Sequence, residues 1–317
     1  MLAGEKRINN REDWQRGNRF RLPVLVLIVV ALIPGGCSPR ATPEATDKLN
    51  ATVSILPQRY FVERIGGDHV KVNVMVGPGA DPHTYEPKPE QLKALSNAAA
   101  YFSIGVDFEN AWLARISAVN SEMWMVDTAQ GIERMPMVAR HHEQEAEEPG
   151  HEEESENPDP HIWTSPRLVK IQSQTICDAL VRIDPEHKVA YQANLQSFLQ
   201  DIDELDADIR EMLDGMENRR FLVFHPAWGY LARDYGLEMV PVEIGGQEPS
   251  AAELTMLITV AKEAGIRVIF AQPEFSTRDA EAIAREIGGE VLLISALAPE
   301  WLDNLRRVAE TFRKVLG

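Results

Sequence analysis

The sequence predicts an α/β protein with two mostly parallel-sheet lobes joined by a long rigid helix. Short apolar segments alternate with amphipathic ones in two series, one over residues 51–126 and one over residues 221–316. This β-α-β alternation is typical of parallel sheets covered by helices. Between the two series, residues 185–216 carry apolar side chains three or four positions apart, which indicates one long helix. The 317 residues are enough for two domains of ordinary size.

The first series supplies the elements of the N-terminal lobe. Residues 70–76 alternate apolar and polar side chains, as a half-buried strand does, and Gly77-Pro78-Gly79 then ends the strand. The other segments are assigned by the same criteria. The expected strands are 51–55, 70–76, 99–104 and 123–126, and the expected helices are 57–65, 89–97 and 108–119.

The middle of the chain and the second series are helix-rich. Ser165-Pro166 is a favourable helix start, because proline suits the first turn. Ser250, with Glu253 three residues later, matches a capping box. The expected helices are 167–183, 185–216, 226–235, 251–264, 277–287 and 301–316, and the expected strands are 221–224, 267–271 and 290–294.

These elements divide the chain into five parts. Residues 1–36 are expected to be a signal peptide and 37–48 a tether. The N-terminal α/β lobe then spans 49–165, a helical linker spans 166–218, and the C-terminal α/β lobe spans 219–317. We expect the metal site described below to lie in the cleft between the lobes.

The N-terminus has the pattern of an export signal. A basic region precedes the apolar run 24–33, and Pro34, Gly35 and Gly36 follow. Ten apolar residues fall well short of the roughly 20 that a membrane-spanning helix needs. Cys37 directly after Gly36 predicts a lipidated cysteine, and hence a periplasmic or cell-surface lipoprotein anchored to a membrane. The alternative is plain cleavage near Gly36, because Pro34 stands where lipoprotein signals prefer leucine.

The charge of the chain excludes one class of partner and marks one unusual segment. A formal net charge of −17 argues against binding to nucleic acid. Much of it lies in residues 141–159, where no lysine or arginine occurs and where we expect disorder. We call this segment the acidic tract; its acids are Glu143, Glu145, Glu147, Glu148, Glu152, Glu153, Glu154, Glu156 and Asp159. Cys177 lies in an expected helix and is interpreted as a small core residue.

Three histidines lie in segments suited to holding a metal ion. His83 and His161 both follow Asp-Pro, and His225 follows the expected strand 221–224. Ligands gather at the carboxyl ends of parallel strands, and neutral imidazole is a preferred zinc ligand. We therefore predict a metal site formed by His83, His161 and His225. Spacing alone does not prove convergence, since a histidine after a strand is more often a packed or surface residue.

Several long motifs resemble the solute-binding proteins of bacterial ABC transporters for zinc and manganese. The resemblance runs from about residue 51 to the end of the chain, with the motifs in the family's order. The segments that carry it are 77–87, 159–163, 224–237, 247–250 and 273–276. It implies two lobes bridged by one rigid helix, with a metal buried between them on His83, His161 and His225. Members with three histidines are usually zinc proteins, whereas manganese members commonly have a carboxylate at the position of His225.

The resemblance also raises two questions about the ligands. Many members supply a fourth ligand, an aspartate, where this chain has Ser295. The fourth position is therefore expected to hold water or a carboxylate from elsewhere, with Asp81 and Glu243 as candidates. The acidic tract, with His141, His142 and His151, resembles the family's variable metal-collecting loop, although a solvated linker has the same composition.

The expected function is extracytoplasmic capture of Zn²⁺ and its delivery to the membrane permease of an ABC transporter, by a monomer that is not an enzyme. Mn²⁺ is a less favoured cargo. The alternatives are a manganese- or iron-binding protein, a metal-dependent adhesin, and a zinc hydrolase, since three histidines and a water also form catalytic zinc sites. No His-Glu-x-x-His motif is present, which disfavours the hydrolase.

Overall fold

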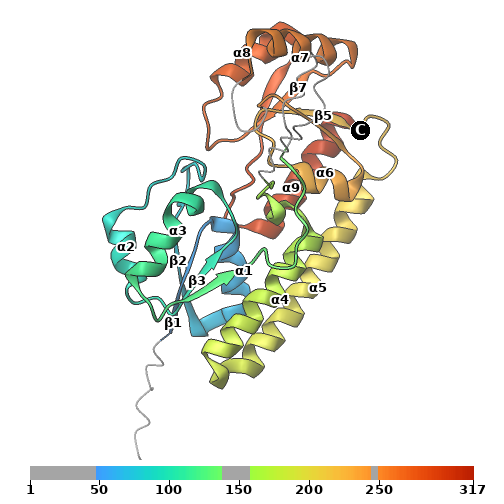
Figure 1. Cartoon of the computed structure of the whole chain (residues 1–317). Helices are drawn as coiled ribbons and strands as arrows, with labels where there is room; N and C mark the ends of the chain where they lie inside the picture. Colours follow the sequence, from blue (N-terminus) through green and yellow to red (C-terminus); the bar gives the residue numbers. More distant parts are fainter. Residues whose placement is uncertain (1–47, 138–157, 244–248) are drawn as a thin grey trace, which may run out of the picture. The chain divides into compact units, whose positions relative to one another are not determined.

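The computed structural model describes residues 48–137, 158–243 and 249–317 (Figure 1). All of them belong to one compact unit, Thr46–Gly317. The expected signal peptide, nearly all of the expected tether, and residues 141–157 of the acidic tract lie outside the described residues. Among the described helices, none is long and apolar enough to cross a membrane.

The N-terminal lobe is built on a four-stranded parallel sheet in the order β2-β1-β3-β4. Central strand β1 pairs with both β2 and β3, so that Ala51 lies between Val72 and Ala100. The bounds are β1 (Leu49–Val53), α1 (Leu56–Gly66), β2 (Val70–Val74), α2 (Pro89–Leu95), β3 (Ala100–Ser103), α3 (Asp107–Val119) and β4 (Trp124–Asp127). All seven elements were expected from the sequence, with ends that differ by one or two residues.

The C-terminal lobe repeats the same strand order as β6-β5-β7-β8, again all parallel. Its elements are β5 (Arg220–Val223), α6 (Gly229–Tyr235), β6 (Glu238–Pro241), α7 (Ala251–Glu263), β7 (Val268–Ala271), α8 (Arg278–Ile287) and β8 (Glu290–Leu293). Strand β6 was not expected from the sequence. In both sheets the second strand is added on one side of the first strand and the later strands on the other side. Such a reversal of strand order leaves a crevice at the carboxyl ends of the strands.

Helix α5 (Lys188–Leu213) is the long helix that the sequence predicts between the lobes. It is shorter than expected, because Pro185–His187 forms a separate 3-10 turn and Asp214 ends the helix. It runs alongside α4 (Pro166–Ile183) (Figure 1) and also packs on α1 and on α9 (Trp301–Leu316). The two-lobed α/β fold with a helix between the lobes is therefore confirmed.

One hydrophobic core runs through both lobes. Trp301, at the start of α9, lies edge-on to Phe61 of α1 with 5.1 Å between ring centroids, and Phe198 of α5 packs on the same Phe61. Farther along α9, Phe312 lies 4.7 Å from Phe221 of the C-terminal sheet, again between centroids. Because α9 contributes to both sides, burial of these aromatic rings stabilises the lobes together.

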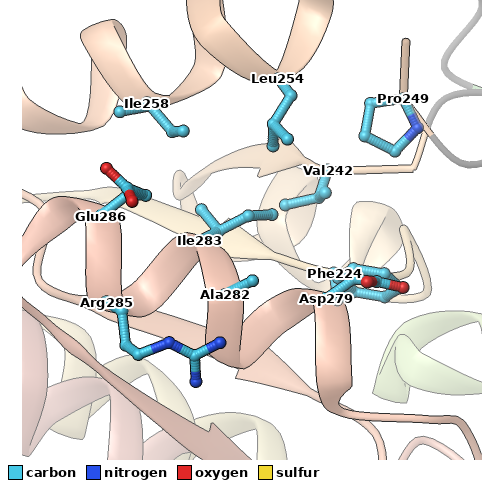
Figure 2. A pocket seen from close by; sticks show the side chains of 10 residues that line it. All are labelled: Phe224, Val242, Pro249, Leu254, Ile258, Asp279, Ala282, Ile283, Arg285 and Glu286. Atoms are coloured by element: carbon cyan, nitrogen blue, oxygen red, sulfur yellow. The ribbon is translucent and has the colours of Figure 1, made fainter. Parts of the chain in front are cut away.

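The outer face of the C-terminal lobe has a separate, smaller core between its sheet and helices α7 and α8. A cavity of about 300 Å³ lies there. Figure 2 shows Leu254 and Ile258 of α7 and Ile283 of α8 directed towards it. Ala261 is the one residue of α7 that is fully buried. No histidine lines this cavity, so it does not belong to the metal site considered next.

Candidate metal centre

The structure brings the three predicted histidines together. Nε2 of His225 lies 3.1 Å from Nε2 of His83 and 3.3 Å from Nε2 of His161. One nitrogen from each ring lies within 4.8 Å of the other two. His83 comes from the loop after β2, His161 precedes the 3-10 turn Ile162–Thr164, and His225 follows β5 by two residues.

The repeated Asp-Pro-His segments have a common local geometry. In each segment the aspartate accepts the backbone N–H of the histidine two residues later, from Asp81 Oδ1 to His83 at 2.8 Å and from Asp159 Oδ1 to His161 at 2.9 Å. Aspartates favour such side-chain turns. The repeat thus fixes the backbone that presents each imidazole.

A carboxylate stands behind every imidazole. Nδ1 of His83 lies 2.7 Å from Oδ2 of Asp107. Nδ1 of His161 lies 2.7 Å from Oδ1 of Asp159, and Nδ1 of His225 lies 2.8 Å from Oε2 of Glu243. An Nδ1–H that donates to a carboxylate leaves the lone pair of Nε2 free and orients the ring. All three rings therefore present a free Nε2 to one point.

The sequence did not predict these carboxylates as partners of the imidazoles, and Glu243 was considered only as a fourth ligand. Asp159 adjoins His161 in the motif, whereas Asp107 and Glu243 lie 24 and 18 residues from their histidines. Asp107 begins α3, just beyond the end of β3, and only the folded sheet brings it to His83.

The distances from Nε2 of His225 to the other two Nε2 atoms are close to those of a tetrahedral zinc site. Zn–N bonds of about 2.0–2.1 Å at tetrahedral angles place neighbouring ligand nitrogens about 3.4 Å apart. Three lone pairs that face one another at the observed distances repel, and a cation between them removes that repulsion. The arrangement can therefore bind a divalent cation and leave one coordination position for another ligand.

The site is enclosed by protein. The whole residues His161 and His225 are each 3% exposed, and the side chain of His83 is 17% exposed. The ring of Phe275 packs on His225 with 5.0 Å between centroids, and Trp163 packs on His161 at 5.1 Å. Such a dry, low-dielectric surrounding strengthens electrostatic binding of a cation.

Burial and neighbouring charges set the protonation of two of the rings. Burial, together with the neighbouring His161 and His83, lowers the pKa of His225 to about 4, although Glu243 opposes the shift. Burial also acts to lower the pKa of His83, but its hydrogen bond to Asp107 and nearby acids outweigh this and leave that pKa above 6.5. The hydrogen bond to His83 in turn lowers the pKa of Asp107.

The residues considered for the fourth position have other partners. Ser295 donates its hydroxyl to Glu274 Oε1 and accepts the backbone N–H of Leu297 at 3.0 Å. Asp81 accepts from His83 N–H and from the Thr84 hydroxyl, and Glu243 holds the back of His225. Within the described residues, the ligand atoms that converge are the three imidazole nitrogens.

The remaining predicted site residues fall elsewhere. His141, His142, His151 and Cys37 lie outside the described residues. Cys177 is a buried free cysteine in α4, as expected for a core residue, and burial raises its thiol pKa to about 11.

Comparison with known proteins gives consistent matches along the chain. Residues 52–315 match the family described as "Zinc-uptake complex component A periplasmic". The chain is 29% identical over 283 residues to the high-affinity zinc uptake system protein ZnuA of Bacillus subtilis (strain 168), covering 88% of this chain and 87% of that protein. It is 27% identical over 304 residues to the manganese-binding lipoprotein MntA of Halalkalibacterium halodurans, covering 90% and 95%.

A solved structure agrees with this assignment. A crystal structure of ZnuA superposes with a TM-score of 0.78 at 45% sequence identity, covering 86% of this chain and 100% of that one. Because the family match covers most of the described residues, the resemblance inferred from the motifs is confirmed: the chain belongs to the family of periplasmic zinc-uptake complex components of ABC transporters.

Proposed function

We propose that this protein captures Zn²⁺ outside the inner membrane on His83, His161 and His225 and delivers it to the permease of an ABC transporter. The observation that carries the proposal is the convergence of three Nε2 atoms, each backed by a carboxylate at Nδ1. The relatives named for zinc uptake support the same cargo. Three imidazoles favour zinc over manganese, which prefers harder oxygen ligands.

We further propose that the centre binds its metal without catalysing a reaction. A hydrolytic zinc site needs a base beside the metal-bound water. Asp107, Asp159 and Glu243 are instead each engaged with the far side of an imidazole. The proposal also includes lipidation at Cys37, a location on the outer side of the inner membrane, and a monomeric state.

The direct test is a metal titration of the purified protein combined with growth of a deletion strain. We expect one tightly bound zinc per chain by elemental analysis. In a competition titration, the protein should take zinc, but not manganese, from a fluorescent chelator. The deletion strain should grow poorly under chelation and recover with added zinc. Tighter manganese binding, or recovery with manganese alone, would point instead to the cargo named for MntA.

The carboxylates behind the imidazoles should contribute to affinity. Glu243→Gln keeps an oxygen near His225 Nδ1 but removes the negative charge, so zinc affinity is expected to drop about 10- to 100-fold. Competition titration measures the change. Glu63→Gln on α1 is the matched control, since Glu63 pairs with Arg59 at the surface and should leave affinity unchanged. Equal affinities of the two variants would show that the carboxylate has no role in binding.

Zinc affinity should also depend on pH through His83. Binding requires an unprotonated Nε2, so affinity is full above the pKa of His83 and falls by about tenfold per pH unit below it. Because that pKa lies above 6.5, the fall begins near neutral pH, whereas His225 adds no competing proton until about pH 4. Asp107→Asn should move the onset to lower pH. Affinity that stays constant down to pH 5 is incompatible with ligation by His83.

A further inference from the structure

A groove of about 750 Å³ lies where residues 131–136 meet the start of α4. Leu168 and Ile171 give it apolar lining, and Glu133 is the one acid among its lining residues. Four cationic side chains line it as well: Arg134, Arg167, Lys170 and Arg233. The groove is thus locally basic in a chain whose formal net charge is −17.

Two of the four cations keep their charge uncompensated among the described residues. Lys170 pairs with Asp203, and Arg233 pairs with Asp234 at 2.7 Å. Arg134 instead donates to the backbone carbonyl of Ile104 at 2.7 Å, which leaves its charge without a counter-ion. Arg167 is exposed on the first turn of α4, with no ion pair in the part of the chain that the structure describes.

The described residues on either side of positions 138–157 meet at this groove. Pro136, which lines the groove, forms an antiparallel bridge with Pro158, so the two ends of the described chain that flank these positions lie together at its edge. Residues 143–156 contain only acidic charges, and no lysine or arginine occurs among them. A segment tethered at both ends beside the groove has an effective concentration in the millimolar range, which is enough for weak contacts to be populated.

We propose that this groove is a docking site for residues 143–156 of the chain's own acidic tract. The tract's carboxylates pair with Arg134 and Arg167, whose charges have no counter-ion among the described residues, and with Lys170, which lines the same groove. Exposed ion pairs are individually weak, so the docking is reversible and weakens as salt is added. The inference concerns a surface apart from the three imidazoles and holds whichever metal they bind.

A zero-length carbodiimide cross-link on the full-length chain tests the docking. The reagent joins Lys170 Nζ to any carboxylate in contact with it, and mass spectrometry identifies the joined peptides. We expect links from Lys170 to glutamates of the tract. Arg167→Glu should reduce them at least about fivefold. Salt near 0.5 M should do the same, because charges more than about 4 Å apart are then largely screened from each other. Arg134→Gln should reduce the same links without reversing a charge.

Two references keep the result interpretable. The link from Lys170 to Asp203, a pair present in the fold, should persist in every variant and report an intact groove. Lys262→Glu with Arg278→Glu lowers the net charge on α7 and α8, which contribute no residue to the groove, and should leave the tract links unchanged.

Two outcomes would overturn the proposal. Tract links that are equally abundant in Arg167→Glu, Arg134→Gln and the control would mean random collision of a tethered segment. If the tract links are absent while Arg167→Glu abolishes binding of the protein to phosphatidylglycerol vesicles, the occupant is an anionic membrane surface instead of the tract.

Discussion

His225→Ala is expected to weaken zinc binding at least about 100-fold. Structural zinc sites bind with roughly 10–16 kcal/mol in total, so one ligand of four accounts for about 3 kcal/mol, or about two orders of magnitude. His225 is the central imidazole of the three, because its Nε2 lies within 3.3 Å of the Nε2 atoms of both His83 and His161. Its loss also leaves Glu243 facing a void without a hydrogen-bond donor. His83→Ala and His161→Ala should cause losses of similar size.

The control for this prediction uses a second pair of histidines. His69 and His187 stack on each other with 3.8 Å between ring centroids, away from the candidate centre. His69→Ala and His187→Ala should leave zinc affinity unchanged within about twofold, which corresponds to about 0.4 kcal/mol. Calorimetric titration with a competing chelator measures all five variants. Near-normal affinity of the three site variants would show that these imidazoles are not the ligands.

Trp301→Ala should destabilise the protein by about 3–5 kcal/mol, the usual cost of removing a buried tryptophan side chain. Trp301 is 1% exposed and packs on Phe61, and its indole N–H donates to the carbonyl of Trp163 at 2.7 Å. The indole of Trp163 in turn donates to the carbonyl of Ala296 at 2.7 Å. The substitution thus opens a cavity and leaves a buried carbonyl without its donor.

Urea unfolding followed by circular dichroism measures this loss. Trp124→Ala is the matched control, because Trp124 lies on edge strand β4 and is 40% exposed. The guanidinium carbon of Arg182 lies 4.3 Å from the centroid of its ring. Its removal should cost at most about 1 kcal/mol. We also expect one cooperative transition, because the core is continuous. A cost for Trp301→Ala no larger than that for Trp124→Ala would contradict the packing described for α9.

Most of the fold was predictable because its elements are locally consistent. Apolar periodicity located seven of the eight strands, and turn residues such as Gly77-Pro78-Gly79 set their ends. Strand β6 was missed because its apolar residues Met239 and Val240 lie between Glu238 and Pro241, which leaves too short an apolar run to mark a strand. The length of helix α5 was overestimated, because Pro185 continues the apolar pattern although it lies in a separate 3-10 turn.

The three histidines that converge were predictable from the sequence, but the carboxylates that hydrogen-bond to them were not. Histidine identity and the Asp-Pro-His repeat identified His83, His161 and His225, and family resemblance supplied the expectation that they meet. Asp107 gave no signal, and Glu243 was expected only as a possible fourth ligand, because a carboxylate becomes a partner of an imidazole only through the packing of strands far apart in the sequence. The hydrogen bond between Ser295 and Glu274 likewise depends on tertiary contacts.

The return of α9 to the N-terminal half limits how the chain can be cut. A truncation after residue 218 would strip Trp301 from Phe61 and remove Arg306, which holds Asp208 of α5 at 2.7 Å. The aromatic surface so bared would favour aggregation of the fragment. The lobes are therefore separate in topology yet inseparable as folding units, and engineered versions should exchange loops around the centre and leave the terminal helix in place.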